Sequence, residues 1–311
     1  MSNITAKMVQ ELREKTGAGM LDCKKALAES NGDMEAAVKI LREKGLAAAA
    51  NRTSKTAAEG LNRICVKDNT AIIVEVNCET DFVTRNESFI AFADSTAEFI
   101  AGTKPADLDA LMNTDIKGIK FSEELASYAA KMGENIKVRR FTLLKAESGE
   151  VFGQYIHGGG KIGVVLKVKL SDASKSEEQS VKDLIKDLCM QIAAAEPKYI
   201  KASEVTQNDL DNERAIYTQQ MKNEGKPEQV IAKIVEGKIS KYYELVCLVD
   251  QLFIKDQAKK VKEVISEVSK QAGISIEPVC FVRYKVGEGI EKKQVDFAAE
   301  VQAQLSAASA K

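Results

Sequence analysis

The 311-residue chain carries 45 basic and 46 acidic residues, which gives a formal net charge of −1. A dedicated nucleic-acid binder usually carries a clear basic excess that neutralises phosphates, so we expect no direct nucleic-acid contact. No apolar run approaches the roughly 20 residues needed to cross a bilayer, and no apolar signal core follows a basic start. We therefore expect a cytoplasmic protein without a membrane partner.

The cysteines are too widely spaced for a metal ribbon, a thioredoxin-like pair or a disulfide framework. We expect them to be reduced and mostly buried, as free cysteines usually are. We also expect no metal and no cofactor. The six are Cys23, Cys65, Cys78, Cys189, Cys247 and Cys280.

The N-terminal stretch shows apolar residues at helical spacing in three short runs. The first run is broken by residues 16–19, where two glycines take turn conformations at little cost. The second run stops near Asn31 and Gly32, and Asp33 can cap a third run that Gly45 closes. The predicted segments are a three-helix module over residues 1–45 and a linker over 46–59.

Beyond the linker the hydrophobic period changes to that of strands. Residues 61–66 and 70–77 predict two strands, and Asn86 can cap a helix that follows them. A similar order returns later, with predicted strands at 137–144, 151–157 and 162–170, a helix over 181–192 and a final strand at 279–286. Two related α+β subdomains explain this order most economically. Their predicted extents are 60–136 and 137–286.

Helical spacing of apolar residues also predicts a hairpin over residues 208–243, inserted into the second subdomain. The chain breaks between its two helices at a Gly225-Lys226-Pro227 sequence. Such a coiled-coil hairpin either pairs with a second copy, giving a homodimer, or lies free. Residues 287–311 predict a C-terminal helical module with an amphipathic helix over 295–305.

No catalytic site is evident in the sequence. His157 is the single histidine, and although it precedes three glycines, no Gly-x-Ser-x-Gly nucleophile elbow accompanies it. The Gly-Lys pairs lack the Ser or Thr that a phosphate-binding P-loop needs. We expect no enzyme, and the glycines after His157 fit a turn between two strands.

Phe82 is an unusual residue for its position, because it is a large aromatic in a polar connection between a strand and a helix. One interpretation is that Phe82 packs down on its own helix and Asp81 serves the turn. The other is that Phe82 fills a partner's pocket and Asp81 supplies charge beside it. Composition alone leaves both open.

Three stretches resemble the elongation factor Ts family. The resemblance spans essentially the whole chain, and the stretches follow the family's order. They are residues 12–27, residues 77–83 with the signature Thr80-Asp81-Phe82-Val83, and residues 286–292 with 296–301. The resemblance implies an N-terminal module similar to ubiquitin-associated domains, a core of two related subdomains, a projecting coiled coil and a C-terminal module.

The resemblance also implies a function in translation elongation. Members of the family are guanine nucleotide exchange factors that bind EF-Tu·GDP, disturb its magnesium site and promote GDP release so that GTP can bind. In this chain the implied residues are Thr80, Asp81, Phe82 and Val83 for magnesium dislocation, and Leu12, Met20, Leu21 and His157 for partner binding. The alternative is a scaffold or adaptor that binds a partner without changing its nucleotide release.

Overall fold

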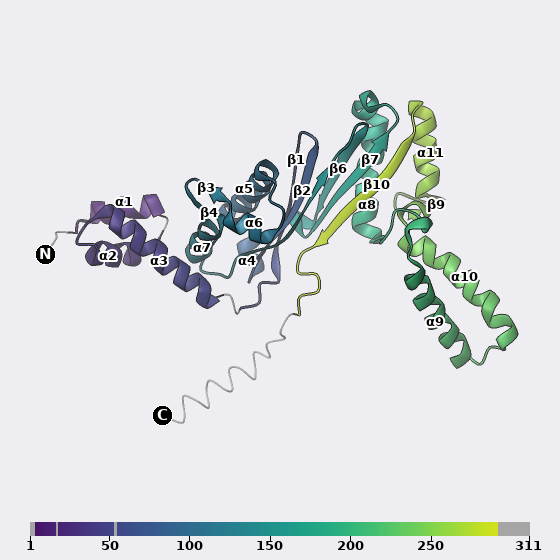
Figure 1. Cartoon of the computed structure of the whole chain (residues 1–311), viewed down its shortest axis with the longest axis horizontal. Coiled ribbons are helices and arrows are strands. Elements are labelled where there is room, and N and C mark those ends of the chain that lie inside the picture. The colour runs from purple at the N-terminus through teal and green to yellow at the C-terminus, as the bar shows by residue number, and fades with distance from the viewer. Residues whose placement is uncertain (1–3, 17, 53–54, 292–311) are drawn as a thin grey trace.

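The computed structural model describes residues 4–16, 18–52 and 55–291. They form a three-helix module, two α+β subdomains and a projecting helical hairpin (Figure 1). The predicted α+β class is confirmed. The helix expected over 295–305 lies outside the described residues, and of the predicted C-terminal module only 287–291 are described. No helix among the described residues is long and apolar enough to cross a membrane.

The N-terminal module contains α1 (Ala6–Thr16), α2 (Met20–Glu29) and α3 (Met34–Arg52). The predicted helix end at Gly45 is wrong, because α3 continues to Arg52. The residues that follow this glycine include four successive alanines, and alanine has the highest helix propensity. The linker predicted to begin at residue 46 is therefore helical in its first half. The core of the module consists of Val9, Leu12, Cys23, Ala26, Leu27 and Ala37.

The first subdomain is built on an antiparallel sheet of order β1-β2-β5. The predicted boundary at residue 137 is wrong, because the strand at 137–145 pairs with β2 and so belongs to this sheet. Cross-strand pairing shows this assignment, because Val74 of β2 lies opposite Arg63 of β1 on one side and Phe141 of β5 on the other. The strands are β1 (Glu59–Lys67), β2 (Thr70–Cys78) and β5 (Lys137–Lys145).

Helices cover the outer face of this sheet, where Ile72, Val74 and Val76 point. Residues 101–136, which the sequence pattern left unassigned, form much of this layer. The elements are α4 (Asp81–Thr84), α5 (Glu87–Thr103), α6 (Leu108–Asn113), β3 (Asp115–Ile116), β4 (Ile119–Lys120) and α7 (Phe121–Met132).

The second subdomain has the same plan, with a sheet of order β10-β7-β6. Its outer face is covered by α8 and α11. The strands are β6 (Glu150–His157), β7 (Ile162–Leu170) and β10 (Ile276–Lys285). The other elements are α8 (Gln179–Ala195), α11 (Val261–Ala272), β8 (Leu252–Phe253), β9 (Asp256–Lys260) and the short 3₁₀ segments η1 (Gly158–Gly160), η2 (Ala173–Glu177), η3 (Ala202–Glu204) and η4 (Leu248–Asp250).

The inner faces of the two sheets pack on each other, so the core has four layers with helices outside and sheets inside (Figure 1). Ala71 and Ile73 of β2 meet Val165 of β7 in this interface. The side chain of Asn62 is fully buried there, and its amide donates to three carbonyl oxygens at 3.2 Å. Those acceptors are the backbone oxygens of Gly160, Lys161 and Tyr284.

Glu75 is a buried carboxylate on β2 that joins distant parts of the chain. It accepts hydrogen bonds from Arg139 at 3.1 Å and from Arg140 at 2.7 Å. It also accepts the backbone N–H of Gly287 at 2.8 Å. Gly287 has a φ of +72°, and a Cβ there would lie 2.3 Å from the carbonyl oxygen of Ala58. Only glycine fits this approach, which fixes the chain after β10 against the first sheet.

The hairpin consists of α9 (Gln207–Asn223) and α10 (Glu228–Val246), close to the predicted 208–243, and it projects from the second subdomain (Figure 1). An ion pair between Arg214 and Glu236 links the two helices at 3.1 Å. Its pairing with a second copy stays a prediction. The hairpin core contains Val205, Leu210, Met221, Ile231, Val235, Ile239, Tyr242, Val246 and Cys247.

Candidate functional site

Phe82 is the most exposed large apolar side chain among the described residues, with 78% of its surface accessible. It lies on the one-turn helix α4, which joins β2 to α5. The interpretation that Phe82 packs down on its own helix is therefore wrong. An aromatic ring of this size gains considerable free energy when a partner covers it, so the position qualifies as a binding anchor.

The residues after Phe82 are held in place by the fold. Val83 packs against the first subdomain's core, and the buried Thr84 hydroxyl donates to the carbonyl of Asp81 at 2.6 Å. Asn86 then caps α5 by accepting the N–H of Ser88 at 2.8 Å. Because these neighbours are fixed by the fold, the exposed ring is attached to an ordered backbone.

The residues before Asp81 are held by two carboxylates. Glu134 accepts the backbone N–H groups of Glu79 and Thr80 at 3.0 and 3.1 Å, and the Thr80 hydroxyl at 2.5 Å. In return, Glu79 accepts the N–H of Asn135 at 2.7 Å. Spacing in the sequence could not reveal this contact, because 54 residues separate Thr80 from Glu134. We call these reciprocal bonds the carboxylate clamp.

Cys78 also supports this turn, through a hydrogen bond from its buried thiol. Burial raises the pKa of its thiol to about 12, so the proton is retained at neutral pH. The thiol donates to the carbonyl oxygen of Thr80 at 3.1 Å. Cys78 is therefore a structural thiol, and its burial makes it unreactive.

Asp81 presents a carboxylate beside the exposed ring. Its side chain is 49% exposed, and its ion-pair partner is the still more exposed Arg85 at 3.3 Å. Ion pairs at such exposed positions contribute only about 0–1 kcal/mol, so a partner can displace Arg85 at little cost. The carboxylate is therefore available to another molecule.

The N-terminal module places its three predicted residues differently. Met20 and Leu21 lie at the start of α2 and are 57% and 65% exposed. Leu12 is completely buried in the core of the module. The expectation that Leu12 contacts a partner is therefore wrong, because its position on the apolar face of α1 directs it against α2 and α3.

His157 lies at the end of β6 and is exposed. Its Nδ1 is 3.0 Å from the hydroxyl of Tyr155, and no other side-chain partner appears among the described residues. Among residues 4–16, 18–52 and 55–291, no serine or cysteine side chain is a hydrogen-bond partner of His157. No group of three or more potential metal ligands occurs in the part of the chain that the structure describes.

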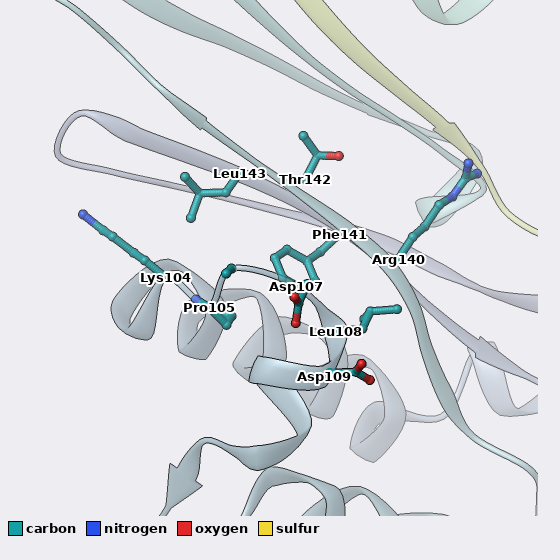
Figure 2. Close-up of a pocket in the computed structure, with 10 residues that line it drawn as sticks. Lys104, Pro105, Asp107, Leu108, Asp109, Arg140, Phe141, Thr142 and Leu143 are labelled. Carbon is teal, nitrogen blue, oxygen red and sulfur yellow. The ribbon is translucent and has the colours of Figure 1, made fainter.

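A hollow of about 810 Å³ along β5 is a concave candidate site (Figure 2). Two of its charged groups, Asp107 and Arg140, already serve the fold. Asp107 caps α6 by accepting the N–H of Ala110 at 2.8 Å. Arg140 points away from Asp107 and Asp109 (Figure 2) and pairs with Glu75 at 2.7 Å. These two charged groups are therefore not free to act on a small substrate.

Comparison with known proteins identifies the family to which the chain belongs. The family model described as elongation factor TS matches residues 79–288. Elongation factor Ts of Clostridium botulinum (strain Alaska E43 / Type E3) is 48% identical over 305 residues, covering 97% of this chain and 99% of that protein. Elongation factor Ts of Clostridium perfringens (strain SM101 / Type A) is 48% identical over 301 residues, with 96% and 98% covered. With identity this high over nearly the whole length of both proteins, this chain belongs to the elongation factor Ts family.

Proposed function

We propose that this protein is a guanine nucleotide exchange factor that binds EF-Tu·GDP and promotes GDP release, so that GTP can bind. The observation that carries the proposal is the exposed Phe82 ring on an anchored turn, in a member of the elongation factor Ts family. The chemistry needs no covalent step. Accordingly we assign no catalytic residue and no cofactor of its own.

The proposed mechanism acts on the partner's magnesium site. In translational GTPases magnesium bridges the protein and the nucleotide phosphates, so its displacement removes a large local charge interaction. Phe82 would insert into the GTPase domain, with Thr80 and Val83 completing the contact. The half-exposed Asp81 carboxylate would then disturb the surroundings of the metal.

The coupling between the two ligands of EF-Tu is reciprocal. If this protein lowers the affinity of EF-Tu for GDP by some factor, GDP lowers the affinity of EF-Tu for this protein by the same factor. The complex is therefore tight without nucleotide and weak with it, and incoming GTP releases the exchange factor. Met20, Leu21 and His157 would contribute further contacts, which raise affinity without acting on the metal.

The test is release of fluorescent GDP from purified EF-Tu, followed by stopped flow with and without this protein. We expect the release rate to rise by orders of magnitude and to saturate with the concentration of this protein. Binding without any change in the release rate would overturn the proposal in favour of an adaptor. Binding should be measured in parallel by analytical ultracentrifugation, so that the two results are separable.

A further inference from the structure

We infer that Glu134 is a positioning residue that holds the Asp81–Phe82 turn in the conformation that exposes Phe82. Its importance for nucleotide exchange rests on the proposed function, but its action on the turn does not. The inference concerns a residue 52 positions further along the chain, outside the signature sequence.

The contacts of Glu134 are those of a clamp. One carboxylate oxygen accepts the N–H groups of both Glu79 and Thr80, and the other accepts the Thr80 hydroxyl. Hydrogen bonds to an ionised acceptor are roughly twice as strong as neutral ones. Because the hydroxyl of Thr80 is engaged by Glu134, it does not cap α4, and the helix begins without a side-chain cap. The external carboxylate thus takes over the role of ordering the start of α4.

Gly133 makes this contact possible. It ends α7 in the left-handed conformation, with a φ of +77°, and its N–H bonds to the carbonyl of Ala129 at 2.9 Å. Glycine adopts this conformation without steric cost, and the chain turns sharply there toward the end of β2. Glu134 is the next residue, so the helix end sets its direction.

The second subdomain provides an internal comparison. There Gly273 ends α11 in the same conformation, and Ser275 two residues later donates its N–H to the hydroxyl of Ser171 at 2.9 Å. Ser171 directly follows β7, as Glu79 directly follows β2. The position that matches Glu134 is Ile274, which packs against the apolar core. In the second subdomain, the end of β7 and the end of α11 are therefore joined without a carboxylate at the position after the glycine.

The difference assigns Glu134 a task that the fold alone does not require. The first subdomain also has a hydrogen bond between the strand end and the helix end, from the N–H of Asn135 to the carboxylate of Glu79. The contacts of Glu134 are additional to this bond. What Glu134 adds are two carboxylate oxygens, which together accept three hydrogen bonds from the two residues that precede Asp81. We therefore expect Glu134→Ala to loosen the turn while the subdomain stays folded.

The experiment uses Phe82→Trp, which creates a single tryptophan because the chain has none. Time-resolved fluorescence anisotropy of this side chain in the full-length protein reports the local mobility of the turn without EF-Tu. In this background Glu134→Ala should increase the amplitude of the fast, nanosecond depolarisation. Glu134→Gln keeps one acceptor oxygen for the two N–H groups and should restore most of the order.

The matched control is Glu263→Ala in the second subdomain. Glu263 also accepts a backbone N–H, that of Lys260 at 2.6 Å, at the start of α11. This variant should leave the anisotropy of Trp at position 82 unchanged. Equal depolarisation in the Glu134→Ala and unsubstituted Phe82→Trp proteins would overturn the inference, as would an equal increase in the control.

A second measurement connects the clamp to exchange. Glu134→Ala should lower the saturating GDP release rate by roughly five- to tenfold, because an unanchored Phe82 side chain must be ordered when it inserts to displace the magnesium. In a Phe82→Ala background the same substitution should have little effect, since it acts through Phe82. Additive effects would contradict positioning. Failure of the proposed function appears separately, as absence of exchange by the unmodified protein, and the anisotropy result still decides the role of Glu134.

Discussion

The two α+β subdomains share one layout. In each, a β-hairpin is followed by a long helix, which is α5 in the first subdomain and α8 in the second. A short two-stranded sheet then precedes a 12-residue helix, α7 or α11. A glycine in the left-handed conformation ends that helix and precedes the third strand. The third strand pairs with the second in both, which gives the orders β1-β2-β5 and β6-β7-β10. This correspondence supports the predicted relationship between the two units more strongly than their sequences do. The hairpin of α9 and α10 is present in the second unit alone.

The connection that follows the second strand differs between the two. After β2 it contains the exposed Phe82, whereas after β7 it contains the polar segment η2 (Ala173–Glu177), which has no large apolar side chain. The layout therefore does not require an aromatic residue at this connection. A side chain that folding does not need, and that exposes its apolar surface to water, is best explained by a binding role.

The second strands differ in charge as well. Glu75 lies three residues before the end of β2, and Lys167 lies three residues before the end of β7. The side chain of Glu75 has no exposed surface and pairs with Arg139 and Arg140. Lys167 is 15% exposed and pairs with Glu150 at 2.9 Å. Each subdomain thus has a paired charged side chain at this position of its second strand, but the first subdomain buries it more deeply.

The largest effect predicted for the two α+β subdomains tests this difference in burial. Glu75→Ala removes the shared partner of two arginines and of the Gly287 N–H, and breaking a buried pair costs about 3–5 kcal/mol of unfolding free energy. The arginine side chains are 27% and 30% exposed and can regain water, so we expect a loss of about 3 kcal/mol. Denaturant unfolding followed by circular dichroism measures it. The control Glu150→Ala should lose less, and equal losses would contradict the comparison.

The second prediction concerns the connection after β2. Phe82→Ala should reduce the saturating GDP release rate by roughly 30-fold, which corresponds to about 2 kcal/mol for an interface anchor. Its melting temperature should stay unchanged, because the ring makes little contact with the fold. Ile216→Ala on α9 removes another exposed apolar side chain and should leave exchange unaltered. Loss of stability in Phe82→Ala would show that the ring serves the fold after all.

Hydrophobic periodicity predicted the elements that bury one continuous face. All six strands of the two main sheets, α5, α8 and the hairpin lie close to their predicted positions. Periodicity could not assign the strand at 137–145 to the first sheet, because a strand's partners depend on contacts far away in the chain. Short elements such as β3 and α6 also escaped prediction, since two to six residues carry too little pattern.

The sequence predicted the signature residues of the candidate site, but not the residue Glu134 that holds them in place. Phe82 stood out because its neighbours are polar, and the family resemblance assigned it a role. Exposure of Met20 and burial of Leu12 both follow from helix orientation, which a short apolar stripe defines poorly. Glu134 gave no signal at all, since carboxylates are common in this chain and its partners are remote in sequence.

The third prediction compares exposed and buried residues within the N-terminal module. Met20→Ala and Leu21→Ala should each weaken EF-Tu binding by about 1 kcal/mol, roughly a fivefold rise in the half-saturating concentration. The saturating release rate should be unchanged, in contrast to Phe82→Ala, because these residues add affinity without acting on the metal. Leu12→Ala should instead destabilise the module by about 2–5 kcal/mol. If Met20→Ala and Leu21→Ala leave the half-saturating concentration unaltered, this surface does not contact EF-Tu.

The smallest predicted effect is the pH dependence that Glu75 contributes. Burial alone would raise the pKa of Glu75, but hydrogen bonds from the Gly287 N–H, Arg140 and Asn77 outweigh it, and the pKa is lowered from its ordinary value of 4.5. A carboxyl whose pKa is lower in the folded state adds stability that is complete above its unfolded pKa. This stability is lost as the pH falls through the folded pKa. Thermal unfolding between pH 7 and pH 3 should therefore show a steeper decrease in melting temperature for the unmodified protein than for Glu75→Gln, and parallel decreases would mean that Glu75 titrates alike in both states.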